Sequence, residues 1–205
     1  MLNLDPNDAI HYTSDQQREI NNLLANKASR TGGELWDEKG PNDVFVGIKD
    51  DIRRHNLQLQ KVRCAFCETV LQYGGVQIEH FVPKWFYSDF LYEPLNLVCS
   101  CPVCNGFANK GKRITINKPV NAVYGSNEFK YVHPFLHDVD KEIKYRDPFR
   151  IIVDKARSSD IGKSTIEMFH WDTLHAKKKR LSNLLFWSTK KSRQIMIEEI
   201  LGFKG

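Results

Sequence analysis

Two Cys-x-x-Cys pairs constrain the fold of this 205-residue chain more than any other feature. Cys64 and Cys67 form the first pair, Cys101 and Cys104 form the second, and 33 residues separate the two pairs. A Cys-x-x-Cys turn presents two thiolates to one ion, and Zn²⁺ prefers four such ligands in a tetrahedron. The spacing therefore predicts a structural zinc site that replaces part of a hydrophobic core.

The expected redox environment favours metal over disulfides. The first residues do not resemble a signal peptide, and no apolar run reaches the roughly 18 residues that a membrane span needs. We therefore expect a cytoplasmic protein without a membrane partner, in which paired cysteines bind metal. The fifth cysteine, Cys99, is expected to be an apolar packing residue.

Charge is uneven along the chain, although the net charge is only +5. Residues 61–118 hold seven basic and four acidic side chains, and residues 155–205 hold eleven basic and five acidic ones. Both segments are positive, as expected for surfaces that face a polyanion such as nucleic acid. Solvated lysine-rich helices would give the same count, so charge alone leaves both interpretations open.

Hydrophobic periodicity divides the chain into three parts and predicts an α+β fold. The parts are an N-terminal helical region, a core with the cysteine pairs and a mainly helical basic region, with boundaries at 1–60, 61–118 and 119–205. In the first part, helices are expected over 14–29 and 42–59, with Ser14 or Asp15 capping the former and the glycines after Thr31 ending it. In the last part, helices are expected from Asp160 onward, the final one over 195–200.

The central part is expected to contain a β-hairpin and a short helix. Residues 69–72 and 76–81 have strand-like sequences on either side of a turn at 73–75. Pro102 favours a helix start directly after Cys101, and this helix is expected to run to about Lys110. Strand, strand and helix around a metal describe a ββα-metal unit.

The segment 64–112 resembles the HNH nuclease family of the zinc-stapled type. The family pattern is a cysteine pair, an acidic residue and histidine followed by two apolar residues and proline, an Asn-Leu, and a second cysteine pair followed by asparagine. The matching residues are Cys64 and Cys67, Glu79-His80-Phe81-Val82-Pro83, Asn96-Leu97, and Cys101, Cys104 and Asn105. The match covers about a quarter of the chain and keeps the order of the family pattern.

The resemblance implies a metal-dependent endonuclease that cleaves DNA by water attack. His80 would be the general base, because an imidazole with a pKa of about 6.5 accepts a proton near neutral pH. Glu79 and Asn105 would bind a catalytic Mg²⁺ or Mn²⁺, and Asn109, one helical turn after Asn105, would add a ligand. Asn96 would orient His80 without touching metal. Adjacent strand residues face opposite ways, so Glu79 and His80 can share a site only where the strand kinks.

The basic contact to phosphate departs from the family pattern. Many members carry a lysine three residues after the asparagine, where this chain has Ala108. The candidates for contacts to nucleic acid are therefore Lys84, Lys110, Lys112 and Arg113.

A looser resemblance concerns residues beyond the core. The His133-Pro134-Phe135 segment and the basic helix around Lys177 are similar to the stand-alone HNH subunits of Septu-type and retron-type anti-phage systems. Those subunits work beside an ATPase, which implies anti-phage defence with a partner protein. Double-strand cutting by one small site would also favour a homodimer or a partner complex. His133 and His137 are four residues apart, as for a metal site on a helix, but Pro134 interrupts that spacing, so we expect loop histidines near DNA or in packing.

Several alternatives stay open from the sequence. A non-catalytic zinc module that binds nucleic acid or protein would need neither His80 nor a second metal. An RNA-cleaving nuclease would use the same chemistry, because phosphodiester cleavage does not itself select the sugar. Redox use of the cysteines is disfavoured, since no βαβ pattern surrounds either pair. The aromatic residues over 85–92 suit stacking on unpaired bases, and equally a supplementary core.

Overall fold

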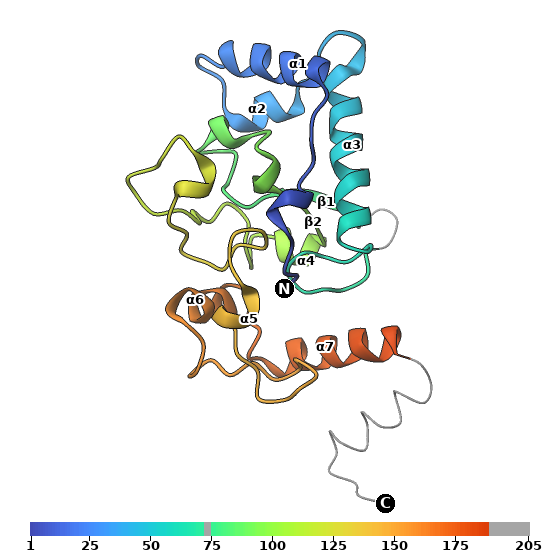
Figure 1. Cartoon of the computed structure of the whole chain (residues 1–205), viewed down its shortest axis with the longest axis vertical. Helices are drawn as coiled ribbons and strands as arrows, with labels where there is room; N and C mark the ends of the chain where they lie inside the picture. The colour runs from blue at the N-terminus through green and yellow to red at the C-terminus, as the bar shows by residue number, and fades with distance from the viewer. Residues whose placement is uncertain (72–74, 189–205) are drawn as a thin grey trace, which may run out of the picture.

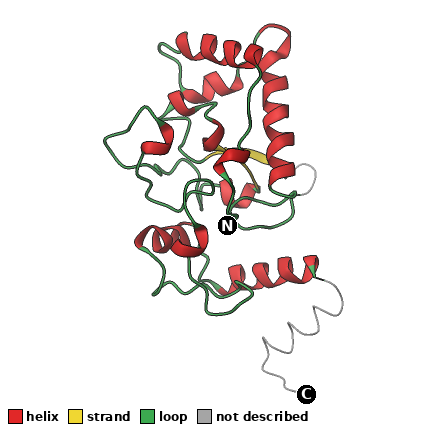
Figure 2. Ribbon diagram, in the orientation of Figure 1, coloured by secondary structure: helices red, strands yellow, loops and turns green. Residues whose placement is uncertain are grey.

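The computed structural model describes residues 1–71 and 75–188, and helices dominate it (Figures 1 and 2). The helices are α1 (Ser14–Ala25), α2 (Gly32–Asp37), α3 (Val44–Leu59), α4 (Pro102–Asn105), α5 (Val139–Glu142), α6 (Asp160–Met168) and α7 (Leu174–Trp187), and the strands are β1 (Gln77–His80) and β2 (Leu97–Ser100). In Figure 1, α1 and α2 lie at one end of the molecule, α5 to α7 lie at the other, and the sheet lies between them. A mixed fold with a small two-stranded sheet confirms the predicted α+β class.

The first and third helices follow the predicted ones closely. The cap of α1 is Thr13 rather than Ser14 or Asp15: its hydroxyl accepts a hydrogen bond from the Gln16 N–H, and the Gln16 side chain accepts one from the Thr13 N–H. The apolar stripes that face the core are Ile20 and Leu23 in α1, and Phe45, Ile48 and Ile52 in α3.

The glycines after Thr31 begin a helix, so the prediction that they end one is wrong. The Thr31 hydroxyl accepts a hydrogen bond from the Glu34 N–H, and this bond caps α2. A Cβ atom on Gly32 would lie 1.9 Å from the carbonyl oxygen of Lys84. Glycine is therefore needed for the close approach of α2 to the segment after β1, which only the tertiary structure reveals.

The predicted hairpin is also wrong, because β1 pairs with a more distant strand. β1 and β2 are antiparallel, with Gln77 opposite Ser100 and His80 opposite Leu97. All four residues of β2 are buried, so the core covers this strand on both faces. The segment expected to pair with β1 contributes a single bridge, between Val70 and Arg63, among the described residues. Most of the predicted turn at 73–75 lies outside the described residues.

The helix after the second cysteine pair is shorter than predicted. α4 ends at Asn105, and Gly106 leaves the helical conformation with φ −66° and ψ 160°. Lys110 and Asn109 lie in the turns that follow, and Gly111 there has a positive φ of 47°. The ββα order is present, but Asn105 and Asn109 do not share a helix face.

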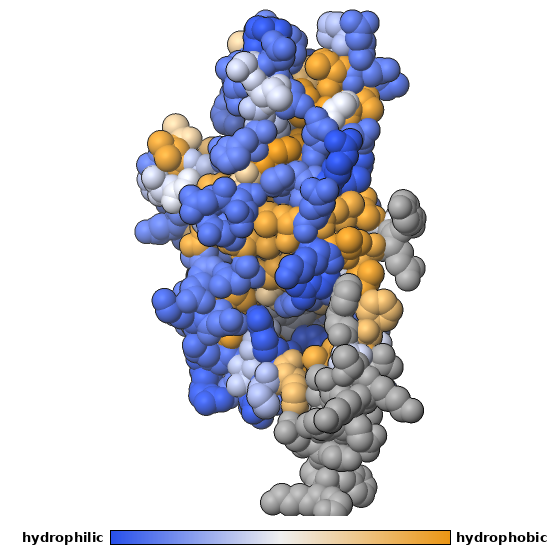
Figure 3. Space-filling view, turned by 45° about the vertical axis from the view of Figure 1, so that its right-hand side comes forward, coloured by the Kyte–Doolittle hydropathy of each residue, from blue (hydrophilic) through white to orange (hydrophobic). Residues whose placement is uncertain are grey.

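Two apolar clusters hold the fold together. The larger one surrounds Cys64 and Cys101 and includes Met1 and Leu2 from the N-terminus and Phe169 and Trp171 from the segment after α6. The smaller one joins α1, α2 and α3 to Leu91, Tyr92 and Leu97. The face in Figure 3 has apolar residues around its middle and a largely polar upper end. The division at 1–60, 61–118 and 119–205 stays a prediction about separate folding units.

The C-terminal part contains two of the predicted helices. α6 begins at Asp160, with Ser159 as its cap, and Thr173 caps α7. The predicted helix over 195–200 lies outside the described residues. Among those described, no helix is both long and apolar enough to cross a bilayer.

Candidate active site and metal centre

The four paired cysteines form one cluster with the geometry of a zinc site. The Sγ atoms of Cys64, Cys67, Cys101 and Cys104 all lie within 4.8 Å of one another. A tetrahedral zinc ion with Zn–S bonds of about 2.3 Å separates its sulfur ligands by about 3.8 Å. The Cys67 and Cys101 sulfurs are 3.7 Å apart, so the donor set and its size fit such an ion. The chain can therefore bind a structural metal such as zinc at this site.

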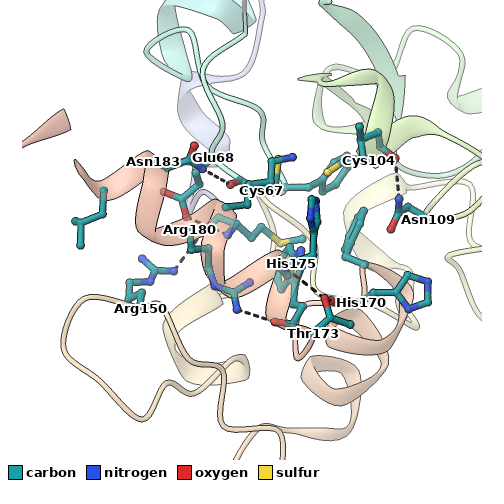
Figure 4. Close-up of a pocket in the computed structure, with 18 of the residues that line it drawn as sticks. Cys67, Glu68, Cys104, Asn109, Arg150, His170, Thr173, His175, Arg180 and Asn183 are labelled. Atoms are coloured by element: carbon teal, nitrogen blue, oxygen red, sulfur yellow. Dashed lines mark hydrogen bonds and ion pairs between the residues drawn. The ribbon is translucent and has the colours of Figure 1, made fainter. Parts of the chain in front are cut away.

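Helix α7 lies against this cluster and supplies polar groups to it (Figure 4). The Asn183 amide donates to the carbonyl oxygen of Cys67 at 3.2 Å. Burial acts to lower the pKa of the Lys179 ammonium, but the nearby sulfurs, Cys67 first, outweigh burial and raise it. The Cys101 pKa falls to about 6, chiefly because Cys104 donates a hydrogen bond to its sulfur. The hydrogen bonds among the sulfurs also lower the pKa of Cys67, whereas they raise that of Cys104 and burial raises that of Cys64, so Cys67 and Cys101 are the two sulfurs that favour the thiolate form.

Cys99 lies apart from the cluster, as predicted for a packing residue. Its side chain is buried in β2, and its sulfur lies 3.7 Å from the carbonyl oxygen of Arg53. Burial raises the Cys99 pKa to about 12, so this thiol stays protonated at neutral pH.

A second site lies between the end of β1 and the segment after α4. It is a cavity of about 170 Å³ that contains the predicted base, one predicted carboxylate ligand, one amide and three of the four predicted basic residues. Those six lining residues are His80, Glu79, Asn105, Lys84, Lys110 and Lys112. Glu79 and His80 are neighbours at the end of β1, and both nevertheless line this cavity. The structure thus brings together groups that are up to 33 positions apart in sequence.

One ring nitrogen of His80 is hydrogen-bonded to the backbone, and the other has no hydrogen-bond partner among the described residues. Its Nε2 lies 3.0 Å from the carbonyl oxygen of Leu91. A carbonyl only accepts hydrogen bonds, so Nε2 carries the proton and Nδ1 keeps its lone pair. No hydrogen bond to Nδ1 is made by residues 1–71 or 75–188. Burial, with Lys84 and Lys110 nearby, lowers the His80 pKa well below its usual value, so the ring is neutral at pH 7.

Asn96 fixes the loop that provides this carbonyl. Its amide nitrogen donates to the carbonyl oxygens of Phe90 at 2.8 Å and Val82 at 3.2 Å. Its amide oxygen accepts from the Val82 N–H at 2.6 Å. Asn96 is fully buried, and Phe90 directly precedes the Leu91 that accepts the bond from His80. The predicted positioning of His80 by Asn96 through the loop is consistent with these bonds.

Two further residues extend this network, and the sequence did not assign them a role. The Phe135 N–H donates to Nδ1 of His133, so Nε2 of His133 carries a proton and donates it to the Tyr124 oxygen at 3.0 Å. The Tyr124 hydroxyl in turn donates to the Asn96 oxygen at 2.9 Å. Burial lowers the His133 pKa well below its usual value, which keeps this chain of donors intact at neutral pH. His133 stood out in its His-Pro-Phe segment, whereas no local signal pointed to Tyr124.

Trp36 of α2 is another neighbour that the sequence did not reveal. Its ring packs edge-on against His80, with centroids 4.5 Å apart and an interplanar angle of 86°. The indole ring of Trp36 carries no charge, so it restricts the orientation of His80 without adding charge to the site.

Glu79 forms a buried ion pair with Lys110. The Lys110 ammonium contacts the Glu79 carboxylate, and the side chains are only 1% and 7% exposed. Burial raises the pKa of Glu79, and the neighbouring Lys110 offsets part of that rise. Glu79, the predicted metal ligand, and Lys110, a predicted phosphate contact, thus form an ion pair with each other.

The oxygen donors in the cavity are fewer than predicted. Asn105 donates its amide hydrogen to Gln77 at 2.8 Å, which leaves its oxygen as a possible ligand. Asn109 donates to the Val103 carbonyl and lines the larger cavity beside α7 instead (Figure 4). Arg113 is bonded to the Asn109 carbonyl and does not line the His80 cavity. One carboxylate and one amide suit Mg²⁺, which keeps several waters and needs few protein ligands.

Among known proteins, the chain is similar to protein ea31 of Escherichia phage lambda. The similar segment is 85 residues long with 32% identity, and it covers 42% of this chain and 24% of the phage protein. The chain thus matches about a quarter of the length of that relative. No protein-family model matches the chain.

Proposed function

We propose that this chain is an HNH-type endonuclease that hydrolyses phosphodiester bonds of DNA, with His80 as general base. The observation that supports this most is the environment of His80. Its unprotonated ring nitrogen belongs to a neutral imidazole in a cavity lined by three lysines, a combination suited to deprotonating water beside a phosphate.

Five residues of the cavity have a role in the proposed reaction. Nδ1 of His80 takes a proton from the attacking water, while Nε2 keeps its bond to Leu91. Lys84 and Lys112 bind and orient the phosphate. Glu79 and Asn105 would hold a Mg²⁺ or Mn²⁺, which supplies charge stabilisation for the leaving oxygen when bound. The four-cysteine zinc holds the frame of the site and takes no part in the reaction.

The test is cleavage of supercoiled plasmid by the purified chain with Mg²⁺ or Mn²⁺, and with EDTA. We expect metal-dependent nicking that falls by about 10²-fold or more in His80→Ala. His55→Ala is the matched control, because His55 is a half-buried histidine of α3 outside the cavity. Equal activity in His80→Ala and wild type would refute the assignment of the base.

A non-catalytic zinc module is the second candidate, and the Glu79–Lys110 ion pair favours it. That pair occupies the carboxylate that a catalytic ion would need. Such a module predicts no cleavage of DNA or RNA under any metal condition, together with nucleic-acid binding that His80→Ala leaves unchanged. The third possibility is a ribonuclease. Cleavage of an RNA of the same sequence, without cleavage of the DNA, would identify it.

We further propose, on the resemblance to Septu-type and retron-type subunits, that the nuclease serves anti-phage defence beside an ATPase partner or as a dimer. The similarity to a phage protein is compatible with a phage-related setting, although the name ea31 states no activity. Toxicity and full-rate cleavage on expression of this chain alone would show that no partner is needed. Light scattering of the purified chain would identify a homodimer.

A further inference from the structure

Exposed aromatic side chains surround the mouth of the His80 cavity. Phe107, between Asn105 and Lys110, is 82% exposed and lines the cavity. Trp85 also lines the cavity with 43% exposure, whereas Phe90 and Tyr92, from the same aromatic run, are buried in the core. Leaving a phenyl ring this exposed forgoes hydrophobic stabilisation, which core packing does not explain.

Trp85 is held firmly in place and contacts a cation. A Cβ atom on Gly33 would lie 2.8 Å from the Trp85 ring, so the indole packs directly on the backbone of α2. The Lys112 ammonium lies over the Trp85 ring, 3.6 Å from its centroid. This cation–π contact holds the ammonium at the cavity mouth without neutralising its charge.

The charge of this mouth favours a polyanion over a protein partner. Three lysines line the cavity against one carboxylate, and that carboxylate is already paired with Lys110. Within residues 1–71 and 75–188, neither Lys84 nor Lys112 forms a salt bridge, although the charges of Glu79 and Asp37 act on Lys84. Two ammonium groups without a salt bridge, beside an exposed ring, match a nucleic-acid strand, whose phosphates alternate with π-faces.

We propose that Phe107 stacks on an unpaired base of the nucleic-acid substrate, while Lys112 over the Trp85 ring binds a neighbouring phosphate. This inference rests on the proposed nuclease and specifies its substrate as a single strand or a locally unpaired site. In a duplex, both faces of each base are covered by neighbouring base pairs, so the phenyl ring finds no free face there.

The test measures binding separately from cleavage. The His80→Ala chain, which cannot cut, is titrated with a fluorescein-labelled single-stranded DNA, the same sequence as RNA, and the DNA duplex, and anisotropy gives each Kd. We expect Phe107→Ala to weaken single-strand binding about tenfold and duplex binding less than about twofold. Phe107→Trp retains tight binding, whereas Phe107→Leu, which keeps bulk without a π-face, behaves like Phe107→Ala. Leu174→Ala is the matched control, because Leu174 is 66% exposed and lies outside the cavity.

The outcomes separate this inference from the nuclease proposal. Wild-type-like binding by Phe107→Leu, or an equal loss on single strand and duplex, overturns the stacking role even if plasmid cleavage depends on His80. A selective loss of single-strand binding without any cleavage by wild type supports the base site and refutes a nuclease that acts without a partner. Failure of the His80→Ala chain to bind any of the three nucleic acids overturns the base site and leaves Phe107 as a surface for protein contact. The RNA arm shows which sugar the site accepts.

Discussion

The four-cysteine cluster and the His80 cavity share the same short stretch of chain but are built in different ways. In the cluster, four side chains from two tight turns converge on one point, and their sulfur atoms all lie within 4.8 Å of one another, close enough to bind one tetrahedral ion. In the cavity, His80 is aligned by a backbone carbonyl, and that carbonyl depends on Asn96, Tyr124 and His133.

The two sites differ in what maintains their geometry. A metal centre enforces its own geometry, because each ligand is bonded to a common ion. The His80 site has no such common atom in its frame, so its geometry depends on buried hydrogen bonds to residues far along the chain. Variants of the two sites distinguish a geometry maintained by a bound ion from one maintained by a polar network.

Loss of the metal is expected to have the largest effect. Cys104→Ser removes one thiolate, and we expect zinc content to fall from about one ion per chain to near zero, with a loss of more than about 5 kcal/mol of stability. Metal analysis and thermal unfolding measure both. Cys99→Ala is the control and should keep its zinc, because Cys99 lies outside the cluster. A Cys104→Ser chain that keeps both zinc and wild-type stability would show that a bound ion does not hold the cysteine cluster together.

The buried ion pair of the cavity comes next. Lys110→Met leaves the Glu79 carboxylate buried without its partner, and we expect a cost of about 4 kcal/mol in urea unfolding. The double variant Glu79→Leu with Lys110→Met should recover most of it, because no charge is then left alone. The exposed pair of Lys163 and Asp160 is the matched control, where Lys163→Met should cost less than about 1 kcal/mol. Equal costs for the two lysines would show that burial does not matter here.

Asn96 tests whether the polar network holds the cavity. Asn96→Ala leaves two carbonyls, one N–H and the Tyr124 hydroxyl without a partner, at an expected cost of about 3 kcal/mol. Asn56→Ala removes one buried bond, to the Leu97 carbonyl, and should cost about 1 kcal/mol. Plasmid cleavage should fall for Asn96→Ala and stay for Asn56→Ala. The network interpretation fails if both variants lose the same stability.

The smallest expected effect is a dependence of stability on pH. His133 is buried with a lowered pKa, so the unfolded chain binds a proton below about pH 6.5 that the folded chain does not bind. Stability therefore falls as the pH drops through 6.5, by about 1 kcal/mol per buried histidine at pH 5.8. Unfolding at pH 7.5 and 5.8 should show this loss in wild type and a smaller loss in His133→Leu. An identical pH dependence would mean that His133 is charged in the folded chain.

Local patterns predicted the parts of the fold that depend on neighbouring residues. The 3.6-residue period of α1 and α3 is visible in the sequence, and so is the spacing of the cysteines. The errors have two causes. Contacts with distant segments set the partner of β1 and the start of α2 at Gly32, and a change of backbone conformation at Gly106 ends α4. Propensity within a short window carries no information about such contacts.

By itself, the sequence predicted the four cysteines of the metal cluster and most of the residues that line the candidate site, because ligand type and spacing are chemical properties of a short segment. The tertiary structure decided which groups meet. Glu79 forms an ion pair with Lys110, and Asn109 lines another cavity. The loop that orients His80 is hydrogen-bonded through Asn96 to Tyr124 and His133. Burial is the physical reason, since a polar group removed from water must find a partner, and that partner is chosen by the packing of the whole chain.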